Sequence, residues 1–99
     1  MNQLSKLADQ LDNTQPTAGM SRLADITLRR AALAELTGDY DQVIKNSRSA
    51  IELAHEAGDL ETESRGYLSW GQALWRTGDY GTAHQTLQSA LDYARRAGT

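Results

Sequence analysis

Histidine and carboxylate side chains are the first candidates for chemistry in this sequence. His55 and His84 are its two imidazoles, the side chains that titrate near neutral pH. Neither stands in an H-x-x-x-H spacing, which would place two histidine ligands for a metal on one face of a helix. We therefore interpret both as surface histidines and expect no metal site.

Asp39 and Asp79 are the carboxylates with the most regular spacing, because each occurs in a TGDY stretch and the two stretches are 40 residues apart. Two carboxylates could serve as the acid and base of a glycosidase. The Ser and Thr residues have no recognisable neighbouring base, and the glycines form no phosphate-binding loop. Recurrence of the whole TGDY stretch favours a repeated structural unit. We expect no enzyme activity and no cofactor.

Composition narrows the classes of partner. The 99 residues include 10 Lys and Arg against 13 Asp and Glu, a formal charge of −3, with no concentrated basic stripe, so we expect no nucleic-acid binding. The chain has no Cys, which excludes disulfides and thiolate sites. No apolar run approaches the roughly 20 residues of a membrane span, and the first residues do not resemble a signal peptide. We expect no membrane association and a cytoplasmic protein.

The TGDY stretches belong to a longer internal repeat. Residues 20–59 align without a gap on residues 60–99, behind a leader of residues 1–19. Identities continue beyond TGDY and include Ser49/Ser89, Ala50/Ala90, Ala54/Ala94, Ala57/Ala97 and Gly58/Gly98. We therefore predict one domain of two equivalent units, 20–59 and 60–99, with the leader 1–19 covering the front of the first unit.

Each unit carries the periodicity of two helices. Apolar and small residues recur at intervals of three and four, as in Tyr40, Val43, Ile44, Ser47, Ala50, Ile51 and Ala54, and again in Tyr80, Ala83, Leu87, Ala90, Leu91 and Ala94. Many Leu and Ala residues also favour helix over strand. We predict an all-α fold with five helices, near 3–13, 20–37, 40–57, 60–77 and 80–97. Short connections between them predict antiparallel neighbours.

The TGDY stretch has a structural interpretation as the turn inside each unit. Its glycine can adopt the left-handed conformation that ends a helix, and its aspartate can cap the next helix. Tyr40 and Tyr80 then begin the second helix and are expected to direct their rings into the hairpin. Ala-Gly at 57–58 and 97–98 ends each pair, and Asp59 can cap the helix that follows.

The second unit also has a pattern of large and small residues on both helices. Its first helix contains Trp70-Gly71 followed by Leu74, and its second has Ala83, Leu87 and Ala90. With the GDY turn, this pattern resembles the tetratricopeptide repeat, and the first unit shares the turn, Ala31 and Ala50. The 40-residue spacing is similar to the long-helix variant of kinesin light chains and of bacterial ATPase-type regulators. The resemblance implies an α-solenoid that holds peptides or partner proteins.

The resemblance further implies a set of groove residues, because the first helix of each pair lines the concave wall in that family. Carried over by position, the set is Asp25, Arg29, Ala32, Glu35, Arg65, Ser69, Gln72, Trp75 and Arg76. Its mixed charges suit an extended peptide whose backbone and acidic side chains need hydrogen-bond donors. Leu28 and Leu68 replace a basic residue that grips C-terminal carboxylates in chaperone-binding relatives, so that ligand is not expected.

The two tryptophans lie five residues apart and therefore on different faces of one helix. Trp70 is expected to pack inside. Trp75 leaves two interpretations open, because an exposed tryptophan often anchors a partner, whereas partial burial at a helix junction is equally consistent with the sequence.

The last predicted helix presents an apolar stripe of Tyr80, Leu87, Leu91 and Ala94. Because solenoid units bury their faces mainly against neighbours, this stripe is expected either to meet further units of a longer chain or to mediate self-association. The sequence thus predicts a non-catalytic scaffold for a peptide or protein partner. The alternative is a sensor module of a larger bacterial transcription activator or signalling ATPase.

Overall fold

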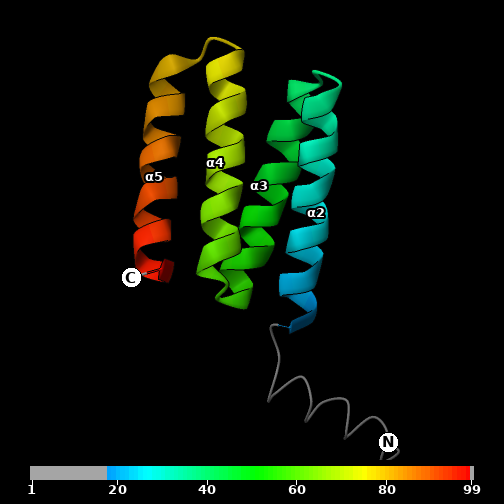
Figure 1. Cartoon of the computed structure of the whole chain (residues 1–99), viewed down its shortest axis with the longest axis vertical. Coiled ribbons are helices and arrows are strands. Elements are labelled where there is room, and N and C mark those ends of the chain that lie inside the picture. Colours follow the sequence, from blue (N-terminus) through cyan, green and yellow to red (C-terminus); the bar gives the residue numbers. More distant parts are fainter. Residues whose placement is uncertain (1–17, 99) are drawn as a thin grey trace, which may run out of the picture.

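The computed structural model describes residues 18–98, which form four helices (Figure 1). They are α2 (Ala18–Leu36), α3 (Tyr40–Ala57), α4 (Leu60–Arg76) and α5 (Tyr80–Gly98). No strand occurs in this range, so the predicted all-α class is confirmed. Each of these helices begins and ends within two residues of its predicted bounds. The helix predicted near 3–13 lies outside the described residues.

Left-handed glycines and aspartate caps separate the helices, as the TGDY stretches predict. Gly38 and Gly78 have φ values of 74° and 89°, and Gly58 has 68°. The carboxylate of Asp39 accepts a hydrogen bond from the Gln42 amide at 3.3 Å and thereby caps α3. These turns confirm the structural interpretation of TGDY, because the glycine conformation reverses the chain and the carboxylate satisfies a free helix amide.

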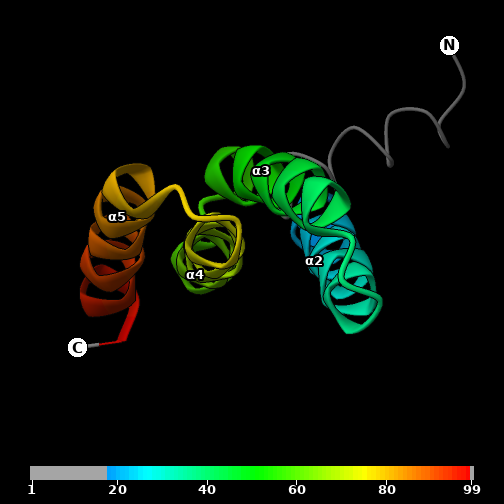
Figure 2. The same cartoon turned by 90° about the horizontal axis from the view of Figure 1, so that it is seen from above.

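Helices that follow one another in the chain lie side by side and run in opposite directions (Figure 1). Seen from above, α3 lies on one side of the layer formed by α2 and α4, and it contacts both (Figure 2). Helix α2 also contacts α4, whereas α5 packs on α4 alone. The surface of α4 that faces away from α3 is therefore flanked by α2 and α5. None of the described helices has the combination of length and hydrophobicity needed to cross a membrane.

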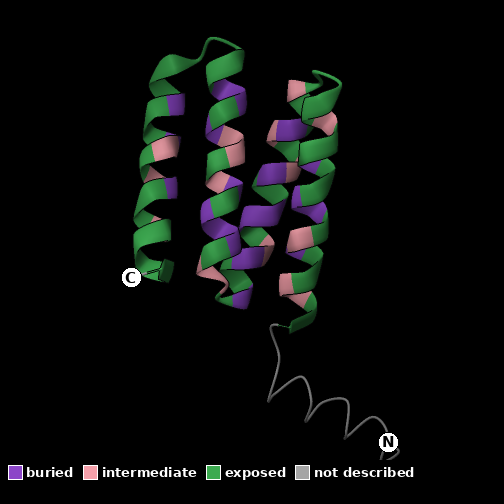
Figure 3. Ribbon diagram, viewed as in Figure 1, coloured by how far each residue is buried: buried purple, intermediate pink, exposed green. Residues whose placement is uncertain are grey.

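Buried residues concentrate where α2, α3 and α4 meet, while α5 is largely exposed (Figure 3). The central cluster consists of Leu28, Ala31, Val43, Ala50 and Ala73. Small residues allow the helices to approach closely. An added Cβ at Gly66 would lie 2.6 Å from Cγ1 of Ile51, and one at Gly71 would lie 2.6 Å from Cδ2 of Leu87. Glycine at these two positions therefore fixes how closely α3 and α5 pack against α4.

Tyr40 and Tyr80 occupy equivalent positions but differ in their surroundings. Tyr40 is half-buried and packs against the central cluster, as expected for a ring directed into the hairpin. Tyr80 is 57% exposed and contacts the edge of Trp75, with ring centroids 4.6 Å apart. The ring of Tyr80 therefore reaches only the outer end of its hairpin. The difference arises because α4 covers α3, whereas no described helix covers α5 in the same way.

Candidate partner-binding groove

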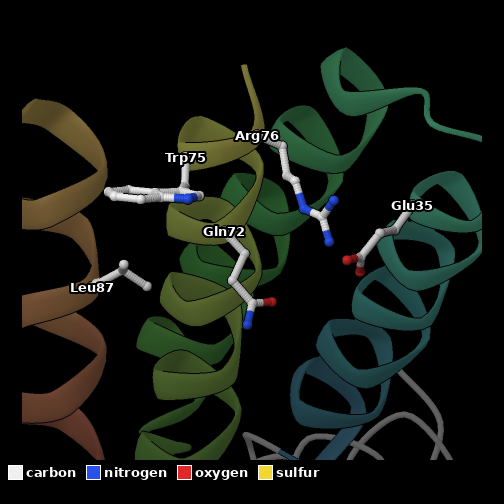
Figure 4. A pocket seen from close by; sticks show the side chains of 5 residues that line it. All are labelled: Glu35, Gln72, Trp75, Arg76 and Leu87. Atoms are coloured by element: carbon white, nitrogen blue, oxygen red, sulfur yellow. The ribbon is translucent and has the colours of Figure 1, made fainter. Parts of the chain in front are cut away.

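Two adjoining hollows lie over α4. One, of about 230 Å³, opens between α2 and α4, and it is lined by Leu28, Arg29, Ala32, Glu35, Arg65, Leu68, Ser69 and Gln72. The other, of about 440 Å³, extends toward α5 and is lined by Glu35, Gln72, Trp75, Arg76 and Leu87 (Figure 4). Because both hollows are lined by Glu35 and Gln72, they adjoin one another, and we name the two together the α4 groove.

The groove residues expected by position come together in the α4 groove. All of them line one of the two hollows except Asp25, which lies at the edge and contacts Arg65. Helical spacing explains the convergence, since Arg65, Ser69, Gln72 and Arg76 follow one another at intervals of four, three and four on α4. Leu28, Leu68 and Leu87 also line the groove, although none of them belongs to that set.

The end of the groove nearest the start of α4 is polar. Asp25 of α2 forms ion pairs with two guanidinium groups, at 3.1 Å from Arg29 and 3.4 Å from Arg65, and accepts a hydrogen bond from Arg65. The arginine side chains are 75% and 49% exposed, so these ion pairs contribute little to stability. Each guanidinium has five N–H donors and keeps some of them available. Asp25 thus lies between two solvent-exposed cations on neighbouring helices.

The opposite end of the groove is largely apolar. Trp75 is 57% exposed, and its indole extends from α4 toward Leu87 of α5 (Figure 4). Tyr80 supports the indole from the following helix. Arg76 and Glu35 extend toward one another across the middle of the groove (Figure 4). Trp75 is therefore exposed and located at a helix junction, and its role as a partner anchor stays a prediction.

The net charge of the groove is positive, whereas the net charge of the whole chain is negative. Three arginines, at 29, 65 and 76, stand against the two carboxylates Asp25 and Glu35, whereas the complete chain has a formal charge of −3. The groove is therefore a locally cationic surface on an acidic protein. Such a surface favours an anionic ligand through complementary potential.

The self-association stripe is only partly free. Leu91 is 49% exposed and Ala94 is also exposed, but Leu87 is half-buried against Gly71 and contributes to the α4 groove. The equivalent residues of α3, Ser47, Ile51 and Ala54, are buried, because α4 covers them. We name Tyr80, Leu87, Leu91 and Ala94 the α5 face.

Sequence reasoning did not identify the buried carboxylate of Glu63. Its side chain is 2% exposed and lies 3.0 Å from Nδ1 of His55, whose side chain is 69% exposed. His55 is thus a surface histidine, as predicted, but it is also the partner of a buried acid. The repeat offered an indirect signal, because the equivalent residue of the first unit is Leu23, an apolar side chain.

A ladder of stacked side chains joins α3, α4 and α5 on the surface away from the groove. It consists of Arg48, Trp70, Tyr67, Tyr93 and Arg96, with successive separations of 5.2, 6.2, 5.2 and 4.9 Å. Trp70 belongs to this surface ladder and is half-buried, whereas the sequence predicts that it packs in the core. Burial, together with interactions with Tyr93 and Glu63, raises the pKa of Tyr67. The ladder fixes the three helices relative to one another.

Within residues 18–98, no group of three or more His, Asp or Glu side chains has an arrangement that could hold a metal ion. Comparisons of the chain with protein-family models, with curated proteins and with solved structures gave no match.

Proposed function

We propose that this protein is a non-catalytic scaffold of the tetratricopeptide type, in which two helical hairpins form a short α-solenoid and present the α4 groove to a peptide or to a segment of a partner protein. The observation that carries the proposal is that the cationic hollow and the apolar hollow adjoin at Glu35 and Gln72. A surface that offers both kinds of contact in a row suits an extended chain.

The groove chemistry defines the class of ligand. Arg29 and Arg65 provide donors for an acidic side chain or for backbone carbonyls, and both lie beside Asp25. At the other end, Trp75 and Leu87 offer an apolar surface on which an aromatic or aliphatic side chain can pack. The expected ligand is therefore an extended acidic peptide with one large apolar anchor.

Peptide selection from a displayed random library tests this proposal. Selected peptides should combine acidic residues with an apolar anchor, and Arg29→Glu with Arg65→Glu should weaken their binding by about tenfold, or about 1.4 kcal/mol. Lys45→Glu with Arg95→Glu is the control, since it makes the same change in net charge at exposed sites outside the groove. Equal weakening in both pairs, or in neither, would contradict a specific role for the groove.

The α5 face supports a second candidate function, association between copies of the chain. Leu91 is 49% exposed, whereas its equivalent Ile51 is 8% exposed under α4. A helix packed on Leu91 and Ala94 would remove comparable apolar surface from water. Partner binding in the α4 groove and self-association through the α5 face both involve Leu87, so the two functions would influence each other.

A further inference from the structure

A third hollow lies between the start of α4 and the end of α5. It has a volume of about 370 Å³ and is lined by Glu61, Ser64, Arg65, Ala94, Ala97 and Gly98. We name it the alanine hollow. Arg65 also lines the hollow between α2 and α4. The alanine hollow therefore adjoins the α4 groove at Arg65, at the end of the groove that is farther from Trp75.

Helical spacing places the alanine hollow on the same side of the α4–α5 hairpin as the hollow beside Trp75. On α4, Glu61 of the alanine hollow and Gln72 of the other hollow are eleven residues apart. On α5, Leu87 and Ala94 line the two hollows and are seven residues apart. Residues seven or eleven apart share one face of a helix. The three hollows therefore follow one another along α4.

The part of the alanine hollow that α5 contributes is apolar. Ala94 and Ala97 are exposed and present only methyl groups. Their equivalents in the first unit, Ala54 and Ala57, are buried, at 0% and 9% exposed. The same pair of alanines is thus covered in one hairpin and open in the other. An apolar side chain that covers Ala94 and Ala97 would remove comparable surface from water.

The polar groups of the alanine hollow decide where a ligand can carry charge. Ser64 already donates its hydroxyl hydrogen to the carbonyl of Ala90 at 2.8 Å. Glu61 disfavours an acidic side chain in the hollow, because like charges repel. Arg65, at the boundary with the α4 groove, favours an acidic side chain through its guanidinium donors. The chemistry therefore suits an uncharged apolar side chain in the hollow and an acidic one beside Arg65.

We propose that the α4 groove and the alanine hollow together bind a peptide that has an apolar anchor on each side of an acidic residue. One anchor packs on Trp75 and Leu87. The acidic residue lies at Arg65, and the second anchor covers Ala94 and Ala97. This inference rests on the proposed function and adds to it a second anchor, an order of residues and a spacing.

The length of α4 between the two anchor sites sets that spacing. Ser64 and Trp75 line the two apolar hollows and are eleven residues apart, which is about 16 Å along a helix. An extended peptide advances about 3.3 Å per residue, so its anchors should be separated by about four to six residues. A helical peptide would need about eleven residues to reach both sites. The two backbone conformations thus predict different sequence patterns.

Alanine scanning of a peptide selected by the full chain tests the pattern. Two apolar positions, about four to six residues apart with an acidic residue between them, should each weaken binding about tenfold when replaced by alanine. A peptide with a single apolar position of this kind would overturn the inference, as would two positions about eleven residues apart. The proposed function fails by a different result, namely selected peptides whose binding does not depend on Arg29 and Arg65.

A thiol in the alanine hollow tests the placement of the second anchor. The chain contains no cysteine of its own, so Ala94→Cys introduces a single thiol there. Its reactivity toward a soluble maleimide should be lost when the selected peptide is saturating. At saturation, one of the two peptides with an anchor replaced by alanine should restore the reactivity, and the other should not. Gln85→Cys is the matched control, since it is exposed on α5 outside the three hollows and should react equally with and without peptide.

Three outcomes of the thiol measurement would overturn the inference. The first is a thiol at residue 94 that no peptide protects, and the second is protection that survives the loss of either anchor. The third is protection that appears without peptide as the protein concentration rises. Because Ala94 also belongs to the α5 face, that result would identify a second copy of the chain as the occupant of the hollow.

Discussion

Nδ1 of His55 lies 3.0 Å from a carboxylate oxygen of Glu63, so an exposed side chain of α3 is the hydrogen-bond partner of a buried acid of α4. Removing one partner of such a pair leaves the buried group unsatisfied, whereas replacing the buried acid by an apolar residue removes the need for a partner. The pair therefore links the two hairpins, although neither residue lines the α4 groove.

His55→Ala should destabilise the protein by about 1 kcal/mol, near the lower end of the cost of an unsatisfied buried group because the imidazole itself is mostly exposed. Glu63→Met should be close to neutral, and His55→Ala should then cost almost nothing in the Glu63→Met background. Urea unfolding of the unmodified protein, the two single variants and the double variant measures the coupling between His55 and Glu63. Additive effects in the double variant would show that the two side chains do not depend on each other.

Acid stability should depend on Asp59, which caps α4. Burial tends to raise the pKa of Asp59, but hydrogen bonds from Ser21 and Thr62 and the charge of Arg65 outweigh it and hold the pKa below the usual 3.8. A lowered pKa in the folded state adds stability above the unfolded value, and this contribution is lost as the pH falls below about 4 through the folded value.

Asp59→Asn should therefore flatten the loss of stability below about pH 4, because asparagine still caps a helix but does not titrate there. Ser21→Ala, which removes one of the hydrogen bonds that lower the pKa, should flatten it partly. Urea unfolding measured from neutral to acid pH gives the slope of the free energy of unfolding against pH for each protein. A slope in Asp59→Asn as steep as in the unmodified protein would refute this assignment.

Gly66→Ala should destabilise the protein by about 1 kcal/mol, because the new methyl group meets Ile51 and this strain exceeds the gain in helix propensity. Ile51→Ala should cost less in that background than in the unmodified chain, since it creates the required space. Gly81→Ala is the control. Nothing lies within 4 Å of a Cβ at Gly81, so this change should be neutral or slightly stabilising in thermal unfolding.

The two tryptophans should separate binding from stability. Trp75→Ala should weaken binding of a selected peptide with little change in Tm, because the indole is 57% exposed. Trp70→Ala should instead lower stability by about 2 kcal/mol, since it removes a half-buried ring that stacks on Tyr67 and carries Arg48. Fluorescence anisotropy and thermal unfolding of both variants check this. Intact binding in Trp75→Ala would remove the apolar anchor from the proposal.

If copies associate through the α5 face, Tm should rise with protein concentration, because association stabilises the folded form by mass action. Leu91→Asp should abolish that dependence. Leu36→Asp introduces the same charge at a residue that is 84% exposed on α2, and this variant should keep the concentration dependence of Tm. A Tm that does not vary over a wide concentration range would argue against self-association.

The sequence was sufficient for the four helices of residues 18–98 and for the turns between them. Helix bounds follow from a period of three to four residues, and the turns follow from glycine and aspartate at fixed places, both of which act over a few neighbouring residues. Because one face of a straight helix is defined by spacing alone, Arg65, Ser69, Gln72 and Arg76 had to lie together. These residues, which the tetratricopeptide resemblance implies by position, line the hollows in the structure.

Tertiary structure decided the surroundings of each equivalent position. Tyr40 and Tyr80 have the same local sequence, yet one ring packs in the core and the other contacts only Trp75. Pairing of His55 with Glu63 and the stacking of Trp70 between Tyr67 and Arg48 likewise depend on which helices meet. Repetition fixes the backbone of each unit, but burial depends on neighbours that are distant in the chain, and these differ for α3 and α5.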